Sequence, residues 1–178
     1  MVCTDERRES MLGPDPKESA MTSISPCLWF DDNLEEAMEF YTKIFPDSEI
    51  TDVSRYGEAG PGEPGKVMAG EWVLDGQTFR GINGGPMYAG FTETISFSVS
   101  CTDQSEVDYY WDNLVAGGEE SMCGWLKDRF GLSWQIVPTR LYELLSDPDP
   151  ARSQAAMQAM LGQRKIVIAE LEAAAAHA

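Results

Sequence analysis

The chain alternates between short apolar runs and polar turns, and one arrangement of these occurs twice. Residues 24–30 are mostly apolar and read as a buried strand, a polar turn follows, and residues 34–45 then carry apolar side chains at helical spacing. Residues 94–101 and 104–116 repeat this order. Alternation with a period of two predicts a strand, and recurrence every three or four residues predicts a helix with one buried face. The repeat therefore predicts two similar strand–helix units.

Each unit is followed by further strand patterns. These lie at 49–56, 67–74 and 77–83 in the first unit and at 119–125 and 132–137 in the second. Asp75 and Gly76 between two of them are a hairpin turn signal, and the glycine- and proline-rich residues 57–65 predict a loop. Asn33 is placed to cap the first helix, because its side chain can accept a hydrogen bond from a free backbone N–H. The expected order is β-α-β-β-β in the first unit, and the second unit repeats this plan with short strands at 119–125 and 132–137.

The two ends of the chain differ from this repeat. Residues 1–22 are polar, contain prolines and show no periodicity, so we expect a flexible extension that contributes little to the core. Residues 23–140 form the predicted domain, with modules at about 23–86 and 92–140. Residues 141–178 are helical and too apolar for a linker, so we expect them to pack on the domain or on the partner of a homodimer. The side chains that favour contact with the partner are Met157, Met160, Leu161, Ile166, Ile168 and Leu171.

Composition and charge exclude several classes of partner. Of 178 residues, 43% are hydrophobic, which suits one globular domain with a full core, and the formal net charge is −17. Such an acidic surface repels phosphate backbones and anionic lipids, so we expect no nucleic-acid and no membrane partner. No apolar run approaches the length of a membrane span, and the N-terminus lacks the apolar core of a signal peptide, so a cytoplasmic location is expected. Four cysteines without paired spacing predict free thiols.

Seven short motifs together carry a family resemblance. They lie at 26–31, 36–41, 45–48, 83–86, 123–131, 133–135 and 144–150. In them the sequence resembles the PhnB-like branch, also labelled 3-demethylubiquinone-9 3-methyltransferase-like, of the vicinal oxygen chelate superfamily of glyoxalases, bleomycin resistance proteins and dioxygenases. The resemblance covers about residues 22–172. It implies an α+β fold in which paired βαβββ modules form a half-barrel sheet, here with a C-terminal helical tail.

The same resemblance implies where a metal ion would be held. Metal enzymes of the superfamily commonly use two histidines with two Glu or Gln side chains, drawn from the first and fourth strands of each module. Here Ser25 and Thr94 occupy the histidine positions, Gln135 occupies one carboxylate position, and Arg80 or Asn83 occupies the other. Hydroxyls and amides are weak ligands and a guanidinium repels a cation. We therefore expect no metal.

The sequence gives no support for another cofactor. An S-adenosylmethionine enzyme usually has a glycine-rich turn between a strand and a helix, whereas residues 57–65 join two strands and are rich in proline, so the methyltransferase label is not supported. The one histidine, His177, is second from the C-terminus, which leaves no histidine-based triad in the domain. We expect no cofactor and assign no catalytic residue.

The expected cavity is lined by aromatic and small polar side chains, which suits a small organic ligand. In the first strand Leu28 and Phe30 should face the helix, which leaves Cys27 and Trp29 for the cavity. The predicted ligand-binding residues are Cys27, Trp29, Arg80, Asn83, Ser96, Ser98, Trp125 and Gln135. We predict metal-free binding of a small molecule by a homodimer. The alternative is a glyoxalase-like lyase, an isomerase or a dioxygenase with non-standard metal ligands, and a structural or regulatory protein is a third reading, because fold alone does not give function.

Overall fold

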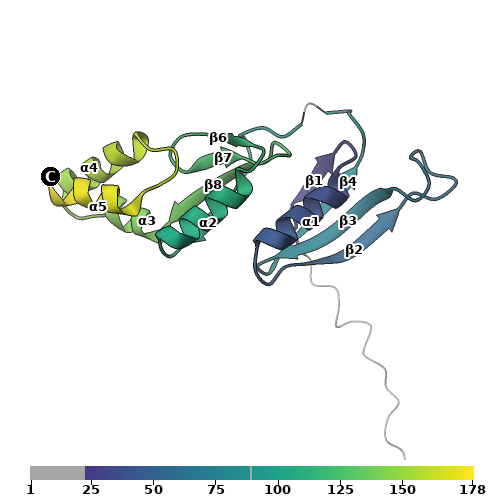
Figure 1. Cartoon of the computed structure of the whole chain (residues 1–178), viewed down its shortest axis with the longest axis horizontal. Coiled ribbons are helices and arrows are strands. Elements are labelled where there is room, and N and C mark those ends of the chain that lie inside the picture. Colours follow the sequence, from purple (N-terminus) through teal and green to yellow (C-terminus); the bar gives the residue numbers. More distant parts are fainter. Residues whose placement is uncertain (1–22, 89) are drawn as a thin grey trace, which may run out of the picture.

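The computed structural model describes residues 23–88 and 90–178, and it contains two βαβββ modules followed by three helices (Figure 1). The first module consists of β1 (Cys27–Phe30), α1 (Leu34–Ile44), β2 (Glu49–Arg55), β3 (Val67–Leu74) and β4 (Gln77–Asn83). The second consists of β5 (Ser96–Cys101), α2 (Gln104–Leu114), β6 (Glu119–Glu120), β7 (Trp125–Lys127) and β8 (Ser133–Pro138). The C-terminal helices are α3 (Thr139–Leu145), α4 (Pro150–Leu161) and α5 (Ile168–Ala176). The predicted extension at 1–22 lies outside the described residues.

Each module forms one four-stranded sheet, and the two sheets have the same strand order. The order is β1-β4-β3-β2 in the first, called sheet A, and β5-β8-β7-β6 in the second, called sheet B. In both sheets the first and fourth strands of the module pair in parallel, and the remaining neighbours pair antiparallel. This topology confirms the α+β fold of paired modules that the repeat predicts.

Helix α1 is held against sheet A by an apolar stripe. Leu34, Met38 and Tyr41 are at most 1% exposed, and their spacing is the helical pattern seen in the sequence. Gly81 in β4 allows the helix to approach closely, because a Cβ atom at this position would collide with a methyl group of Leu34. The stripe therefore fixes both the face and the depth at which α1 packs.

The start of α1 is capped by a different residue from the predicted one. The Asn33 side chain makes no capping hydrogen bond, so that prediction is wrong. Instead, the Asn83 Oδ1 atom accepts a hydrogen bond from the Leu34 N–H at 3.0 Å, and its Nδ2 donates to the Val67 carbonyl at 2.9 Å. Asn83 lies at the end of β4 on the helix-facing side, so a residue distant in sequence satisfies one of the free donors of the first turn.

The first strand of each module is shorter than predicted. β1 begins at Cys27 and β5 begins at Ser96, where pairing with β4 and β8 starts. Ser25 and Thr94, which the resemblance placed at histidine positions, therefore lie before the strands rather than in them. The neighbouring Ile24 is 95% exposed, so the chain before β1 does not contribute to the core.

The two modules pack through the sheet faces that carry α1 and α2. Phe45 stacks on Trp134 with ring centroids 5.4 Å apart, and Phe79 meets Phe97 edge-on at 5.0 Å. These contacts join both modules into one hydrophobic core, and Figure 1 shows the modules side by side with α1 and α2 near their junction. The opposite faces of the sheets are turned away from the junction. We call them the open faces of sheets A and B.

The C-terminal helices pack on the second module of their own chain. Gln104 at the start of α2 fixes them, since its Nε2 donates to the Ile166 carbonyl at 3.0 Å and its Oε1 accepts from the Ile168 N–H at 2.9 Å. They share a second, smaller core with β8, made of Val137, Leu141, Leu144, Ala156, Ile166, Leu171 and Ala175. The helical tail is thus part of the folded chain.

This packing changes the expectation for the tail in assembly. Ile166 and Leu171 are fully buried in their own chain, so they cannot contact a partner, whereas Met157 and Leu161 are 40% and 57% exposed. The tail therefore leaves less apolar surface than its sequence suggests. None of the described helices is long and apolar enough to cross a membrane.

Candidate functional site

The open face of sheet A carries Cys27 and Arg80 side by side, because β1 and β4 pair in parallel with these residues in register. Cys27 is exposed and its thiol is free. The Arg80 Nε atom donates to the Glu71 carboxylate at 2.9 Å, from the neighbouring position on β3. A guanidinium has several donors, and this contact uses one of them. Sheet A thus presents a thiol beside an oriented guanidinium.

Trp29 lies on the same strand as Cys27 but closes over the loop that follows β4. Its Nε1 donates to the Gly85 carbonyl at 2.9 Å, and its ring meets Tyr88 edge-on with centroids 4.9 Å apart. Gly84 lies beneath the indole, since a Cβ atom there would collide with the ring. Leu28 is buried while Trp29 is half-buried, which is the alternation expected from the sequence. The indole forms a wall at one end of the open face.

Asn83 lies on the helix-facing side of β4 and is 7% exposed. The side-chain amide of Asn83 is hydrogen-bonded to the backbone of α1 and β3, as described above. The backbone carbonyl of Asn83 accepts a hydrogen bond from the Tyr56 hydroxyl at 2.7 Å. The sequence left Arg80 and Asn83 as alternatives for the fourth-strand position. Arg80 faces the open side, and Asn83 holds the end of the strand to the helix.

The open face of sheet B carries the other predicted ligand residues. Ser98, Gln135 and Trp125 are in register across β5, β8 and β7. The Gln135 Nε2 atom donates to the Ser96 Oγ at 2.8 Å. The pair can therefore offer an incoming molecule one acceptor, the Gln135 Oε1, and one donor, the Ser96 hydroxyl. Trp125 is half-buried beside this pair and supplies an aromatic surface.

A single chain does not bring these two groups of residues together. The residues of sheet A and those of sheet B lie on the open faces, while the helix-bearing faces are joined in the common core. Side chains such as Cys27, Arg80 and Ser98 are accordingly exposed. Within one copy of the protein neither open face is covered by the other module, although the C-terminal helices pack on Val137 at the end of β8.

The side chains on the open faces do not fit a transition-metal centre. At the first- and fourth-strand positions they are Cys27, Arg80, Ser96 and Gln135, which offer one thiol with a guanidinium, a hydroxyl and an amide. Such ions need imidazole, thiolate or carboxylate ligands in a fixed geometry. Within residues 23–88 and 90–178, no three His, Cys, Asp or Glu side chains converge as metal ligands would. The donor set that the superfamily uses is not reproduced.

Sequence reasoning missed Asp128, a buried residue in the turn between β7 and β8. It is 2% exposed and accepts hydrogen bonds from the Tyr41 hydroxyl at 2.7 Å, from Trp134 Nε1 at 2.8 Å and from the backbone N–H groups of Phe130 and Leu132. Burial raises the pKa of Asp128 and raises the pKa of Tyr41 well above its usual value. Because Tyr41 belongs to α1, this carboxylate ties the two modules together. In the sequence the position is a turn residue, and nothing there signals its contact with Tyr41.

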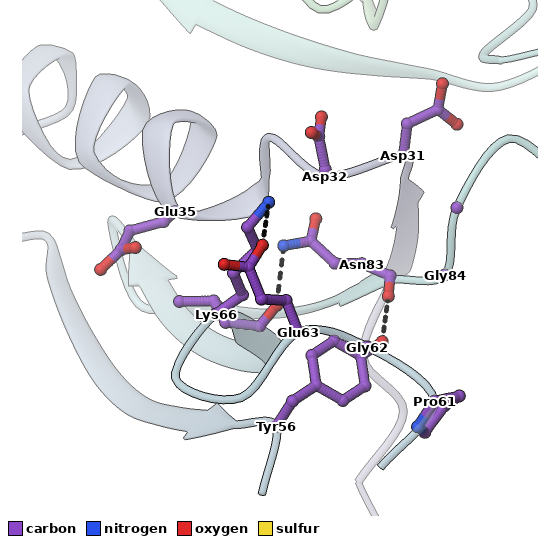
Figure 2. Close-up of a pocket in the computed structure, with 12 residues that line it drawn as sticks. Asp31, Asp32, Glu35, Tyr56, Pro61, Gly62, Glu63, Lys66, Asn83 and Gly84 are labelled. Atoms are coloured by element: carbon purple, nitrogen blue, oxygen red, sulfur yellow. Dashed lines mark hydrogen bonds and ion pairs between the residues drawn. The ribbon is translucent and has the colours of Figure 1, made fainter. Parts of the chain in front are cut away.

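A separate cavity lies between the start of α1 and the loop before β3. It has a volume of about 500 Å³, and Asn83 is the predicted ligand residue that lines it. Figure 2 shows the carboxylates of residues 31–35 on one side and the Glu63–Lys66 pair, 3.1 Å apart, on the other. At its base, Asn83 and the Tyr56 hydroxyl are already bonded within the chain. We assign no ligand to this cavity, because its buried polar groups have their partners.

Comparison with known proteins identifies the family. The profile of the 3-demethylubiquinone-9 3-methyltransferase family matches residues 22–137. The chain belongs to this family. The match covers both βαβββ modules and ends before α3, so the C-terminal helices lie beyond the matched region. Among curated protein sequences, none matches the chain significantly.

Solved structures agree with this assignment. The PhnB protein from Bacillus cereus is 36% identical in sequence and superimposes with a TM-score of 0.62. The alignment covers 66% of this chain and 100% of the Bacillus cereus protein. A Pseudomonas aeruginosa protein has 22% identity over 66% of this chain and 98% of its own, with a TM-score of 0.56. The fosfomycin resistance protein FosX from Listeria monocytogenes has 17% identity over 72% of this chain and 98% of its own, with a TM-score of 0.52. The last two show a shared fold alone. The family match and the PhnB structure confirm the PhnB-like resemblance.

Two tryptophans on opposite sides of the sheets should respond differently to truncation. Trp134→Ala should lower the free energy of unfolding by about 3–5 kcal/mol, because Trp134 is 3% exposed and packs on Phe45 and Phe97. Trp29→Ala should cost clearly less, because the indole is half-buried and its hydrogen bond goes to a loop. Urea denaturation of both variants measures the difference. Equal losses would show that Trp29 belongs to the core rather than to a binding surface.

Proposed function

We propose that this protein binds a small organic molecule, without a metal ion, in a cavity that forms between two copies of the chain. In this homodimer the open face of sheet A of one copy lies opposite the open face of sheet B of the other. The proposed ligand contacts are Cys27, Trp29 and Arg80 from one copy, with Ser96, Ser98, Trp125 and Gln135 from its partner.

The observation that carries the proposal is the packing of the modules through their helix-bearing faces. This packing leaves the aromatic, thiol, guanidinium, hydroxyl and amide groups on surfaces that a single chain does not cover. Two such sheet faces placed opposite each other would enclose a hollow with apolar walls and a few polar groups, the usual form of a small-molecule site. A two-fold axis pairs face A with face B twice, so each dimer would hold a pair of identical cavities.

Exposed apolar side chains beside the open faces support this assembly. Ile24, just before β1, is 95% exposed, and Ile82, in register with Trp29, is 37% exposed. Met122, just before β7, is 42% exposed. Large apolar side chains exposed beside both open faces favour contact with another chain there. The proposed dimer would bury them together with the open faces.

The chemistry of the proposed lining favours binding over acid–base catalysis. The Arg80 guanidinium is paired with Glu71, and the Ser96–Gln135 pair consists of groups that do not exchange protons near neutral pH. A general base must lie within hydrogen-bond reach of the reacting proton and titrate near the working pH. The family's name describes a methyltransferase, but the lining offers hydrogen bonds and aromatic contacts rather than an obvious acid–base pair.

Native mass spectrometry of protein purified without chelators tests the proposal. We expect about twice the 19.7 kDa chain mass, as for a symmetric dimer, together with a small organic adduct. Elemental analysis of the same sample should find no stoichiometric transition metal. Gln135→Ala should lose the adduct while remaining dimeric, because it removes a lining group and not an interface anchor. A monomer, or a dimer that retains a metal ion through dialysis, would contradict the proposal.

A further inference from the structure

A second row of side chains crosses the open face of sheet B, next to the row that contains Gln135. Ser96, Ser133 and Lys127 are in register across β5, β8 and β7, and Glu119 on β6 pairs with Lys127. Residues in register on neighbouring strands project to the same side of a sheet. At the β6 end of this row lies a small cavity of about 130 Å³. The cavity therefore adjoins the surface on which we place the ligand.

Ser133 lines this cavity with a buried hydroxyl that has no partner. The residue is 1% exposed, and its Oγ makes no hydrogen bond with any of the residues 23–88 and 90–178. A buried polar atom without a partner costs free energy, and nearly all such atoms in folded proteins are paired. Trp72 Nε1 is also unpaired, but its ring is stacked between Tyr41 and Phe79 inside the core. The Ser133 hydroxyl differs because it borders a cavity, where a bound group can supply the missing partner.

The other walls of the cavity carry more negative than positive charge. Lys127 pairs with Glu93 at 2.6 Å, and this hydrogen bond lowers the pKa of Glu93 and raises the pKa of Lys127. The Glu120 carboxylate lies 3.9 Å from Arg164. Glu119, in register with Lys127, forms no ion pair within the described part of the chain, although its charge also raises the pKa of Lys127. The polar and aromatic lining residues are Glu93, Glu119, Glu120, Ser121, Trp125, Lys127 and Ser133. The lining residues thus include three glutamates and one lysine, and a cation is the favoured occupant.

We infer that this cavity binds the ammonium group of a small organic amine whose remainder extends over Trp125 and Gln135. The inference rests on the proposed function, because the remainder of the ligand would occupy the cavity between the two copies. An ammonium has donors only, so it can satisfy both the Ser133 Oγ and the Glu119 carboxylate, and the Trp125 ring adds a favourable aromatic surface for a cation. A volume of about 130 Å³ is on the order of four water molecules, which suits a head group and its adjoining carbon atoms.

A bare metal ion fits the cavity less well than an ammonium. Within the described residues, no three carboxylate, thiol or imidazole side chains converge there as ligands. The Glu93 carboxylate is held by Lys127 and the Glu120 carboxylate lies near Arg164. A divalent cation needs several oxygen ligands at short and similar distances, whereas an ammonium needs only separate acceptors. The arrangement of hydroxyl, carboxylate and indole is the pattern that recognises an amine.

Three probes that share a phenyl ring and differ in the head group test this inference. They are phenethylamine, phenethyl alcohol and hydrocinnamate, and their affinities for the dimer are measured by isothermal titration calorimetry. We expect the amine to bind at least about tenfold more tightly than the alcohol, and the carboxylate to bind most weakly. Equal affinities for amine and alcohol would overturn the inference.

Matched variants locate the binding group. Glu119→Gln keeps the shape of the side chain. It should lower the affinity for the amine about tenfold or more and leave the affinity for the alcohol unchanged. Glu58→Gln removes the same charge from the exposed loop before β3 and should change neither affinity. Ser133→Ala should lower the affinity for the amine severalfold. It should also raise the melting temperature of the free protein, because the unpaired hydroxyl is gone. If Glu119→Gln and Glu58→Gln act alike, or Ser133→Ala binds the amine as the parent does, the amine only senses the acidic surface.

The outcomes also separate this inference from the proposed function. If the amine shows no preference but native mass spectrometry finds an adduct that Gln135→Ala loses, the cavity between copies stands and the ammonium site is wrong. If the amine binds a monomer, with the Glu119 and Ser133 effects intact and no effect of Gln135→Ala, the ammonium site stands and the cavity between copies is wrong.

Discussion

Replacing Asp128 by alanine should lower the free energy of unfolding by about 2–6 kcal/mol. The carboxylate accepts from the Tyr41 hydroxyl and the Trp134 indole, and both of these donors lie in the core between the modules. Without Asp128 each buried donor loses its partner, at a cost of about 1–3 kcal/mol each. For a chain of this size the loss corresponds to a fall of about 10 °C in the melting temperature. Urea denaturation followed by tryptophan fluorescence measures both the loss and the cooperativity of the transition.

Two control variants show whether the loss comes from the junction. Tyr41→Phe keeps the ring in the core and removes one donor, so it should cost about 1 kcal/mol. Asp52→Ala truncates an exposed aspartate on β2, whose nearby partner is Ser54 at 3.4 Å, and should change stability by less than about 0.5 kcal/mol. If Asp128→Ala behaves like Asp52→Ala, the carboxylate does not hold the modules together.

The strand–helix repeat could be predicted from the sequence because its signal is local. Leu34, Met38 and Tyr41 are spaced for one buried face, and their burial depends only on a sheet being present beneath the helix. The alternation of Leu28 and Trp29 likewise fixes which side of β1 is buried, whatever the sheet packs against. From these patterns the fold, the order of the elements and the orientation of Cys27 and Trp29 could be predicted.

The contacts that the sequence did not reveal join residues far apart along the chain. The cap of α1 comes from Asn83 at the end of β4, although Asn33 stands at the usual position for a cap. Asp128 meets Tyr41 only once the modules have packed. Polar side chains carry no periodic signal, so their partners depend on the tertiary arrangement rather than on local spacing.

The candidate site was predictable in its composition and not in its assembly. Sequence alternation places Ser96, Ser98 and Gln135 on one face of sheet B. In the structure Ser98 is in register with Gln135, whose amide donates to the Ser96 hydroxyl. Whether that face meets sheet A of the same chain or of another depends on which sheet faces form the core. The stacking of Phe45 on Trp134 and the contact of Phe79 with Phe97 decide this. Neither contact can be predicted from the sequence, because all of these residues are aromatic side chains on apolar faces.

Mixed dimers should therefore recover binding that each parent variant has lost. Arg80→Ala alters the open face of sheet A and Gln135→Ala alters that of sheet B, so homodimers of either variant should bind the co-purified molecule at least about tenfold more weakly than the parent. A mixed dimer pairs both altered faces in one cavity and both unaltered faces in the other. Isolated by two different affinity tags, it should bind at parent affinity with about half the parent stoichiometry, as calorimetry would show.

The reciprocal dimer tests the same geometry in the opposite direction. A chain that carries both Arg80→Ala and Gln135→Ala, paired with an unaltered chain, contributes one altered face to each cavity that forms between the copies. That dimer should bind weakly at both cavities although one of its chains is intact. If each cavity instead lay within a single chain, this dimer would keep one full-affinity site and the mixed dimer of single variants would keep none. The two dimers thus give opposite results for the two arrangements, and recovery in the doubly altered pair would place the cavity inside one copy.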